Sequence, residues 1–182
     1  MNVKYLETAI HEETNATRQA HGKASLAYDS ALRIVARYHS HRMAGAGQLF
    51  HIAPHGETLR DRIEKLEYNY LAKSSGQQFC HDCGADLRAI VSPRHCTSCG
   101  VATCDSTVHE CVLGENLAYF KSGTKIPTVP SPEDIAATIV DGWLNSPEHR
   151  ENLMREKFNR EAIGVVILQN NGFEIYVTQH FS

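Results

Sequence analysis

Four cysteines in the middle of the chain form the most specific chemical pattern of the sequence. Residues 79–100 read FCHDCGADLRAIVSPRHCTSCG, in which Cys80 and Cys83 form one Cys-x-x-Cys pair and Cys96 and Cys99 form a second pair. Four thiolates suit tetrahedral Zn²⁺, and the glycine that follows each pair can take the positive φ that ends a tight turn. The spacing predicts a zinc ribbon, whose closed four-sulfur site is structural and not catalytic.

The distribution of the cysteines favours zinc over disulfides. All six lie between Cys80 and Cys111, whereas a secreted disulfide scaffold spreads its cysteines over the domain. A pair of redox-active dithiols is the competing interpretation, but such dithiols normally occur singly beside a helix. Cys104 and Cys111 remain, with His109 between them. They could form a second, weaker metal site or a disulfide, and two free buried thiols are the favoured interpretation.

Composition and charge narrow the classes of function. The chain has 182 residues, of which 42% are hydrophobic, and a formal net charge of −3, so it can bury one core and has no general attraction for nucleic acid. Glu7, Glu12 and Glu13 interrupt the apolar stretch that a signal peptide needs, and no segment approaches the ~18 apolar residues of a membrane span. We therefore expect a cytoplasmic protein without a membrane span.

Helical spacing of apolar residues dominates the first part of the chain. Val3, Leu6 and Ile10 form a stripe, and Glu7 is expected to lie off it. A second helix is expected after an N-cap at Asp29, and a third over residues 57–67. The buried faces of these two helices are predicted to contain Leu32, Ala36, His39 and Met43 in the second, and Leu59, Ile63 and Leu66 in the third.

The last part of the chain predicts two more helices and a β-hairpin. Ser131-Pro132 and Ser146-Pro147 each combine a capping hydroxyl with proline at the first helical position, and Trp143 falls on the apolar face between them. The segments AIGVVILQ and FEIYVTQHF, on either side of Asn170-Asn171-Gly172, predict an antiparallel pair of strands.

Helices followed by strands indicate an α+β domain, with helices packed on a small antiparallel sheet. Neither half of the chain could bury its apolar face alone. We therefore predict one discontinuous domain formed by residues 1–75 and 112–182. Residues 76–111 are predicted to be an inserted zinc-ribbon region, since a long insertion in a loop costs little entropy.

Several strings of the sequence occur together in one known family. They are TNATRQAHGKASLAYDSAL (14–32), HSHRMA (39–44), FHIAPHGETLRDRI (50–63), GENLA (114–118), GWLNSPEHRENLM (142–154) and the final YVTQHF. With these motifs the chain resembles the CAP superfamily of cysteine-rich secretory proteins, antigen 5 and pathogenesis-related proteins, and is most similar to its compact prokaryotic branch. The resemblance implies an α-β-α sandwich and covers Thr14 to Phe181 outside the ribbon region.

The resemblance also implies a cleft lined by histidines and acidic residues. Carried over motif by motif, the cleft residues are His51, Glu115 and His149, while the family's fourth position has no match because Asp141 and Glu148 are out of register. Two imidazoles and a carboxylate could hold Zn²⁺ or another divalent ion with one position open for water, which is hydrolytic chemistry. The same three residues could instead form a satisfied polar network.

Two functions follow from these expectations. The first is a binding module, in which the cleft takes a small apolar ligand or a peptide and the ribbon, expected at the rim of the cleft, recruits a protein partner. The alternative is a metal-dependent, peptidase-like hydrolase that uses His51, Glu115 and His149. His39 and Trp143 are interpreted as core residues, and nucleic-acid binding is disfavoured.

Overall fold

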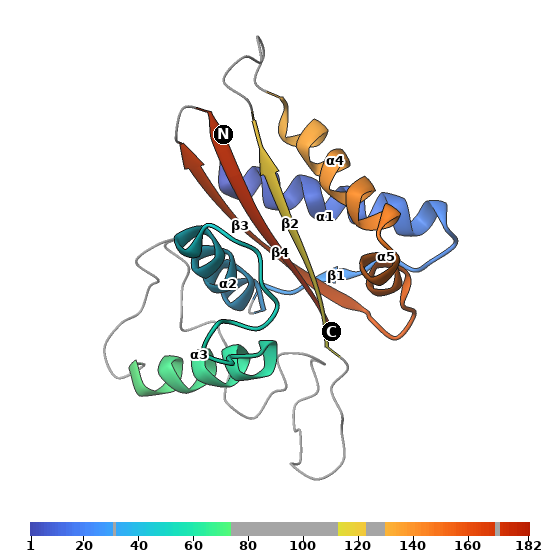
Figure 1. The fold of residues 1–182 in the computed structure, drawn as a ribbon. Coiled ribbons are helices and arrows are strands. Elements are labelled where there is room, and N and C mark those ends of the chain that lie inside the picture. The colour runs from blue at the N-terminus through green and yellow to red at the C-terminus, as the bar shows by residue number, and fades with distance from the viewer. Residues whose placement is uncertain (31, 74–112, 123–129, 170–171) are drawn as a thin grey trace.

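The computed structural model describes residues 1–30, 32–73, 113–122, 130–169 and 172–182, and within these ranges it has five helices and a four-stranded sheet (Figure 1). The residues of the predicted ribbon, and Asn170-Asn171, lie outside these ranges. The prediction that the ribbon stands at the rim of the cleft therefore also concerns residues outside the described part of the chain. The mixed α/β architecture that the sequence predicted is confirmed.

The predicted hairpin forms the centre of the sheet. Strands β3 (Arg160–Gln169) and β4 (Phe173–Phe181) are antiparallel neighbours in the order β1-β3-β4-β2. Two edge strands were not predicted: β2 (Gly114–Lys121) runs antiparallel to β4, and the short β1 (Ala27–Tyr28) is parallel to β3. The sheet is therefore antiparallel except for one short pair.

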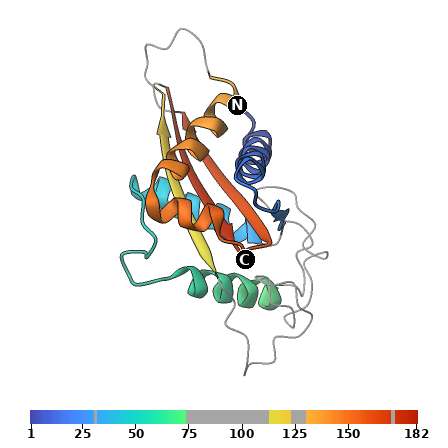
Figure 2. The ribbon, with the colours of Figure 1, turned by 90° about the vertical axis from the view of Figure 1, so that its right-hand side faces the viewer.

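Helices cover both faces of the sheet, which gives three layers. Helices α1 (Val3–Ala20), α4 (Pro132–Asn145) and α5 (Pro147–Met154) lie on one face, and α2 (Leu32–Ala46) lies on the other with α3 (Leu59–Lys73) packed against it (Figures 1 and 2). This arrangement is the predicted α-β-α sandwich.

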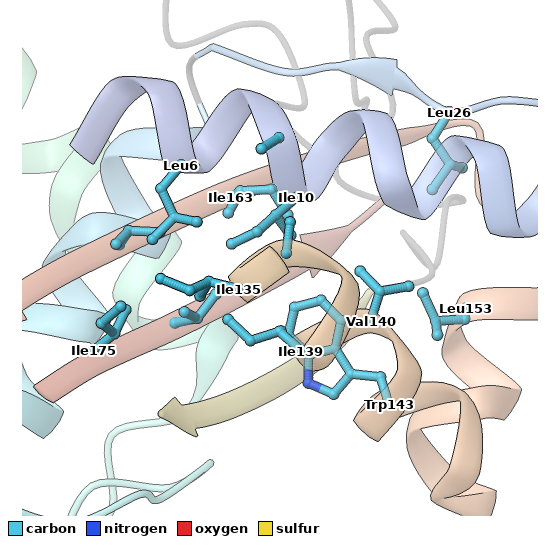
Figure 3. Close-up of a cluster of buried hydrophobic side chains, with 14 of the residues drawn as sticks. Leu6, Ile10, Leu26, Ile135, Ile139, Val140, Trp143, Leu153, Ile163 and Ile175 are labelled. Atoms are coloured by element: carbon cyan, nitrogen blue, oxygen red, sulfur yellow. The ribbon is translucent and has the colours of Figure 1, made fainter. Parts of the chain in front are cut away.

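The main hydrophobic core fills the space between the sheet and α1, α4 and α5 (Figure 3). Trp143 is buried there, as predicted, and its indole N–H donates to the backbone oxygen of Leu117 at 2.8 Å. Asn152 on α5 donates to the backbone oxygen of Glu115 at 3.3 Å. These two side chains bind backbone carbonyls on the outer side of the edge strand β2. Carbonyls left unpaired at such an edge could pair with a strand of another chain.

The prediction that Glu7 lies off the apolar stripe is wrong. Its side chain is buried and accepts hydrogen bonds from Arg37, at 2.6 and 2.7 Å, and from the backbone N–H of Val165 at 3.2 Å. Since β1 pairs only with Arg160 and Glu161 of β3, Val165 lies beyond the covered part of that edge. Glu7 supplies the acceptor that a neighbouring strand would have supplied.

Three of the predicted helix starts can be compared with the observed caps. The side chain of Asp29 accepts from the backbone N–H of Leu32 at 2.9 Å, and Ser131 forms a capping box, so both predictions are confirmed. Ser146 precedes α5 but forms no side-chain capping hydrogen bond, so its predicted capping role is wrong. Helix α3 is longer than the predicted 57–67.

A glycine permits the close packing of α2 on the sheet. A Cβ at Gly164 of β3 would lie 2.2 Å from backbone atoms of Ala36 and Arg37, which is far inside van der Waals contact. Ser40, one turn further along α2, donates to the backbone oxygen of Gly164 at 2.8 Å. This contact fixes the position of α2, and with it that of His39, relative to the sheet.

Candidate functional site

Glu115 is at the centre of a buried polar cluster on the α2 side of the sheet. It lies on β2 directly opposite His180 of β4, so both side chains project from the same face. The side chain of Glu115 is 7% exposed, and that of His180 is fully buried. A carboxylate removed from water in this way needs hydrogen-bond donors around it.

Three side chains donate to the Glu115 carboxylate. His51 Nδ1 lies 2.9 Å from Oε1, while His180 Nε2 and Arg62 Nη2 lie 2.8 Å and 2.5 Å from Oε2. His39 Nε2 is further away, 3.7 Å from Oε2, and donates to the backbone oxygen of Phe50 at 2.8 Å. The cluster therefore contains one carboxylate, one guanidinium and three imidazoles.

The loop between α2 and α3 brings His51 to this cluster. Arg62 Nη1 donates to the backbone oxygen of His51 at 3.1 Å and to that of Glu57 at 3.4 Å, so one guanidinium ties the loop to the carboxylate. His39 holds the same loop one residue earlier through Phe50. The ring of His51 remains partly in solvent, because its side chain is 54% exposed.

His149 approaches the cluster from the other layer of helices. It lies in the first turn of α5, and its backbone oxygen accepts from the side chain of Asn116 on β2 at 3.1 Å. Its ring centroid is 6.5 Å from that of His51. Partial burial, followed by the proximity of His51, lowers the pKa of His149. The structure thus brings together all three residues that were carried over from the family, although only His51 and Glu115 share a hydrogen bond.

The surroundings determine the charge of the cluster. Burial alone would raise the pKa of Glu115, but hydrogen bonds from His180 and His51, together with the positive charge of Arg62, hold it well below its ordinary value. Burial lowers the pKa of His39 to about 4 and also lowers the pKa of His180. At neutral pH the cluster is an ionised Glu115–Arg62 pair accompanied by neutral His39 and His180.

These donors do not fit the divalent cation that the sequence analysis considered for the cleft. Oε2 of Glu115 already faces two N–H donors, one of them a guanidinium, and Oε1 faces the N–H of His51. A cation bound to Glu115 would have to displace these donors and lie beside the charge of Arg62. Within the described part of the chain, no group of three or more His, Cys, Asp or Glu side chains is arranged to hold a metal ion.

Three members of the cluster were not predicted as site residues: Arg62 and His180, and also His39, which was interpreted as a core residue. Arg62 occupies a position on the apolar face of α3 between Leu59 and Ile63, and a charged residue on such a stripe is a signal that a buried partner exists. His180 is the last polar residue before Phe181 in YVTQHF. Its role depends on the pairing of β2 with β4, and β2 was not recognised as a strand.

A second polar network supports the opposite face of the same strands. Gln179 accepts from Asn116 at 3.2 Å and donates to Glu161 at 2.6 Å, and Glu161 also contacts His11 Nδ1 on α1 at 2.6 Å. Complete burial raises the pKa of Glu161. Because Asn116 also holds the backbone of His149, this network links α1 to the position of α5 beside the site.

Comparison with known proteins identifies the family. The sequence model of the cysteine-rich secretory protein family, CAP, matches residues 11–181, and the chain therefore belongs to this family. No curated protein sequence matches the chain.

Solved structures of bacterial proteins show the same fold. An extracellular SCP-domain protein of Bacillus anthracis has a TM-score of 0.54 at 23% identity over 98% of this chain, and an outer surface protein of Borrelia burgdorferi has a TM-score of 0.57 at 18% identity over the whole chain. A cysteine-rich secretory protein of Staphylococcus aureus has a TM-score of 0.51 at 15% identity over 99% of this chain. The chain matches 40%, 96% and 39% of these three proteins, respectively.

Across the described ranges, no helix combines the length and the apolar composition that a membrane span requires.

Proposed function

We propose that the chain is a binding module of the CAP family that recognises its ligand through His51 and His149. The observation that carries this proposal is the buried ion pair between Arg62 and Glu115, whose closest atoms are 2.5 Å apart. This ion pair binds the carboxylate of Glu115 inside the protein. The partly exposed imidazoles of His51 and His149 are then the groups available to a ligand. The arrangement favours recognition over metal-assisted hydrolysis.

Exposed apolar residues lie on the same loop as His51 and indicate the character of the ligand. Ile52 is 61% exposed and Leu49 is 42% exposed, so they flank the Phe50-His51 step with apolar surface. A small apolar ligand, or a peptide with apolar side chains and one polar group, would match this combination.

The ribbon is proposed to add a second binding element. Cys80, Cys83, Cys96 and Cys99 supply four thiolates at the spacing of a structural zinc site. A closed zinc site supports a small folded surface without chemistry of its own, which suits recruitment of a protein partner.

The proposal is tested by selecting peptides from a random displayed library on immobilised protein. The double variant His51→Ala/His149→Ala serves as the counter-selection. Peptides that bind the wild type and lose at least about tenfold in affinity for the variant support the binding module, since the loss of a contact worth ~1.4 kcal/mol gives that factor.

A hydrolysis assay on the same two proteins tests the alternative. Labelled casein is incubated with and without added Zn²⁺. Zinc-stimulated cleavage by the wild type that is absent in the double variant would establish the hydrolase in place of the binding module.

A further inference from the structure

The two oxygens of Glu115 have different partners. Oε2 accepts from Arg62 and His180, whose side chains are both fully buried, whereas the close donor to Oε1 is the partly exposed His51. One oxygen is thus fixed by the interior of the protein, and the other is presented to the loop that carries His51.

This asymmetry determines which nitrogen of His51 carries the proton. An ionised carboxylate can only accept hydrogen bonds, so the nitrogen that faces Glu115, Nδ1, must be the one with the hydrogen. In a neutral imidazole the other nitrogen, Nε2, is then an acceptor with a free lone pair. Among the described residues, no hydrogen bond reaches Nε2 of His51.

A second histidine of the molecule provides a comparison. His11 also directs Nδ1 at a carboxylate, that of Glu161, at 2.6 Å. Its Nε2 lies 3.4 Å from the side-chain nitrogen of Asn15, so an internal donor is already present there. His51 has the same kind of carboxylate contact but a more exposed ring, with side-chain exposures of 54% against 20% for His11. Unlike Nε2 of His11, Nε2 of His51 has no donor among the described residues and is therefore available to a ligand.

We propose that Arg62 and His180 are positioning residues that hold His51 as the Nδ1–H tautomer, so that its Nε2 accepts a hydrogen bond from a hydroxyl or an amide N–H of the ligand. Without these two donors, Glu115 would be a desolvated carboxylate. It would favour its protonated form, which can donate to Nδ1 and reverse the tautomer of His51. This inference rests on the proposed function, because it specifies the polar group of the ligand at the same site.

His180 is suited to this role because its ring is fixed. It is enclosed between β2 and β3, opposite Glu115 on one side and Ala162 on the other. Its Nε2 faces the carboxylate and therefore carries the hydrogen. A glutamine at this position could also direct an N–H at Oε2, whereas a methionine of similar size could not.

The tautomer can be measured without a ligand. Protein labelled with ¹⁵N-histidine is studied by long-range ¹H–¹⁵N NMR at a pH where His51 is neutral, which distinguishes the protonated nitrogen from the unprotonated one in each ring. In the wild type we expect the Nδ1–H form of His51 to exceed the Nε2–H form by roughly tenfold or more, because a hydrogen bond to a charged acceptor is strong. A predominant Nε2–H form would overturn the proposal.

Two substitutions then isolate the positioning role. His180→Met is expected to lower the ratio of the two tautomers by about tenfold or more, and His180→Gln is expected to restore most of it. His55, whose side chain is 53% exposed and whose Nε2 lies 3.9 Å from Glu57, is the internal control and should not change. A ratio for His51 that stays at the wild-type value in His180→Met would contradict the proposal.

Arg62→Gln provides a second test if His180→Met does not fold. Glutamine removes the charge that favours the ionised form of Glu115, so the ratio should again fall, and an unchanged ratio would contradict the role of Arg62. Because no peptide takes part in these measurements, the tautomer can be confirmed while peptide selection fails, and the converse can also occur. The failure of the positioning role is therefore distinguishable from failure of the proposed binding function.

Discussion

Arg62 on α3 and Glu115 on β2 form an ion pair in which both side chains are buried. Replacing Arg62 by methionine would leave the carboxylate without its charged partner, and breaking a buried pair in this way typically costs ~3–5 kcal/mol. We expect Arg62→Met to lower the free energy of unfolding by an amount of this order, measured by urea denaturation.

The exposed pair Lys121–Glu174 provides the matched control for Arg62. Its ammonium and carboxylate groups are 2.7 Å apart, but the lysine side chain is 60% exposed. Lys121→Met should leave stability nearly unchanged, since water replaces the lost partner. If the two methionine variants lost equal stability, burial would not be the reason why the Arg62 pair matters.

Acid should destabilise the protein through the histidines that are buried in their neutral form. The pKa of His39 is lowered from 6.5 to about 4, so folding favours the neutral ring. This contribution is fully present above pH 6.5 and is lost as the pH falls toward 4. The lowered pKa of Glu115 acts in the same direction below pH 4.5, its ordinary value. We expect His39 to contribute ~2–3 kcal/mol to the loss between pH 6.5 and 4.

Unfolding measurements at several pH values, with His39→Gln beside the wild type, test this expectation. Glutamine can keep the hydrogen bond to Phe50 but does not titrate. The variant should show a smaller loss of stability between pH 6.5 and 4, and curves of equal slope would show that His39 is not the group responsible.

The fold could be predicted from the sequence wherever a local pattern determines an element. The stripe of Val3, Leu6 and Ile10 gave α1, and the two long apolar segments gave the central hairpin. The edge strands could not be predicted in this way. β1 has only two residues. β2 begins with the motif GENLA and has apolar residues on both faces, so neither strand shows the alternation of a half-buried strand.

The site was predicted only as far as the family motifs reach. The structure places His51 against Glu115 and the ring of His149 near that of His51. Arg62 and His180, which set the charge of Glu115, belong to tertiary contacts between distant elements that no local motif indicates. Glu7 was misjudged for a related reason. A charge four residues after Val3 and three before Ile10 is on the apolar stripe, and such a residue is buried when the fold provides partners such as Arg37.

The contact between Gly164 and α2 predicts a large effect from one added methyl group. Gly164→Ala would place Cβ 2.2 Å from the backbone of α2, so the helix must move, and overpacking of this kind typically costs ~1–3 kcal/mol or more. Because α2 carries His39, we also expect changed NMR signals for His39 and His51. The free energy of unfolding and the histidine spectra measure the two effects.

Gly142 is the matched control for this substitution. It lies inside α4, and a Cβ there would meet nothing within 4 Å. Gly142→Ala should increase stability by ~0.5–1 kcal/mol, because alanine has the better helix propensity. A loss of stability at Gly142 as large as that at Gly164 would refute the steric explanation.

The two Ser-Pro helix starts should differ in energy although their sequences are alike. Ser131→Ala removes a capping hydrogen bond and should cost ~1 kcal/mol, whereas Ser146→Ala removes no side-chain cap and should cost much less. Thermal or urea denaturation of both variants provides the comparison. Equal losses would mean that proline and the backbone, and not the hydroxyl, determine both helix starts.

The last prediction concerns the metal content of the whole chain. If Cys80, Cys83, Cys96 and Cys99 bind one Zn²⁺ and the Glu115 cluster binds none, elemental analysis should give one zinc per wild-type chain. Cys80→Ser should lose most of it, because removal of one thiolate opens the tetrahedral site.

The variant His51→Ala/His149→Ala is the counterpart and should keep one zinc per chain, since Arg62 already neutralises the carboxylate that a cation would need. Full zinc in Cys80→Ser would disprove the ribbon. A second equivalent of zinc that disappears only in the histidine variant would show that a cation can displace Arg62 from Glu115, and would return the hydrolase to consideration.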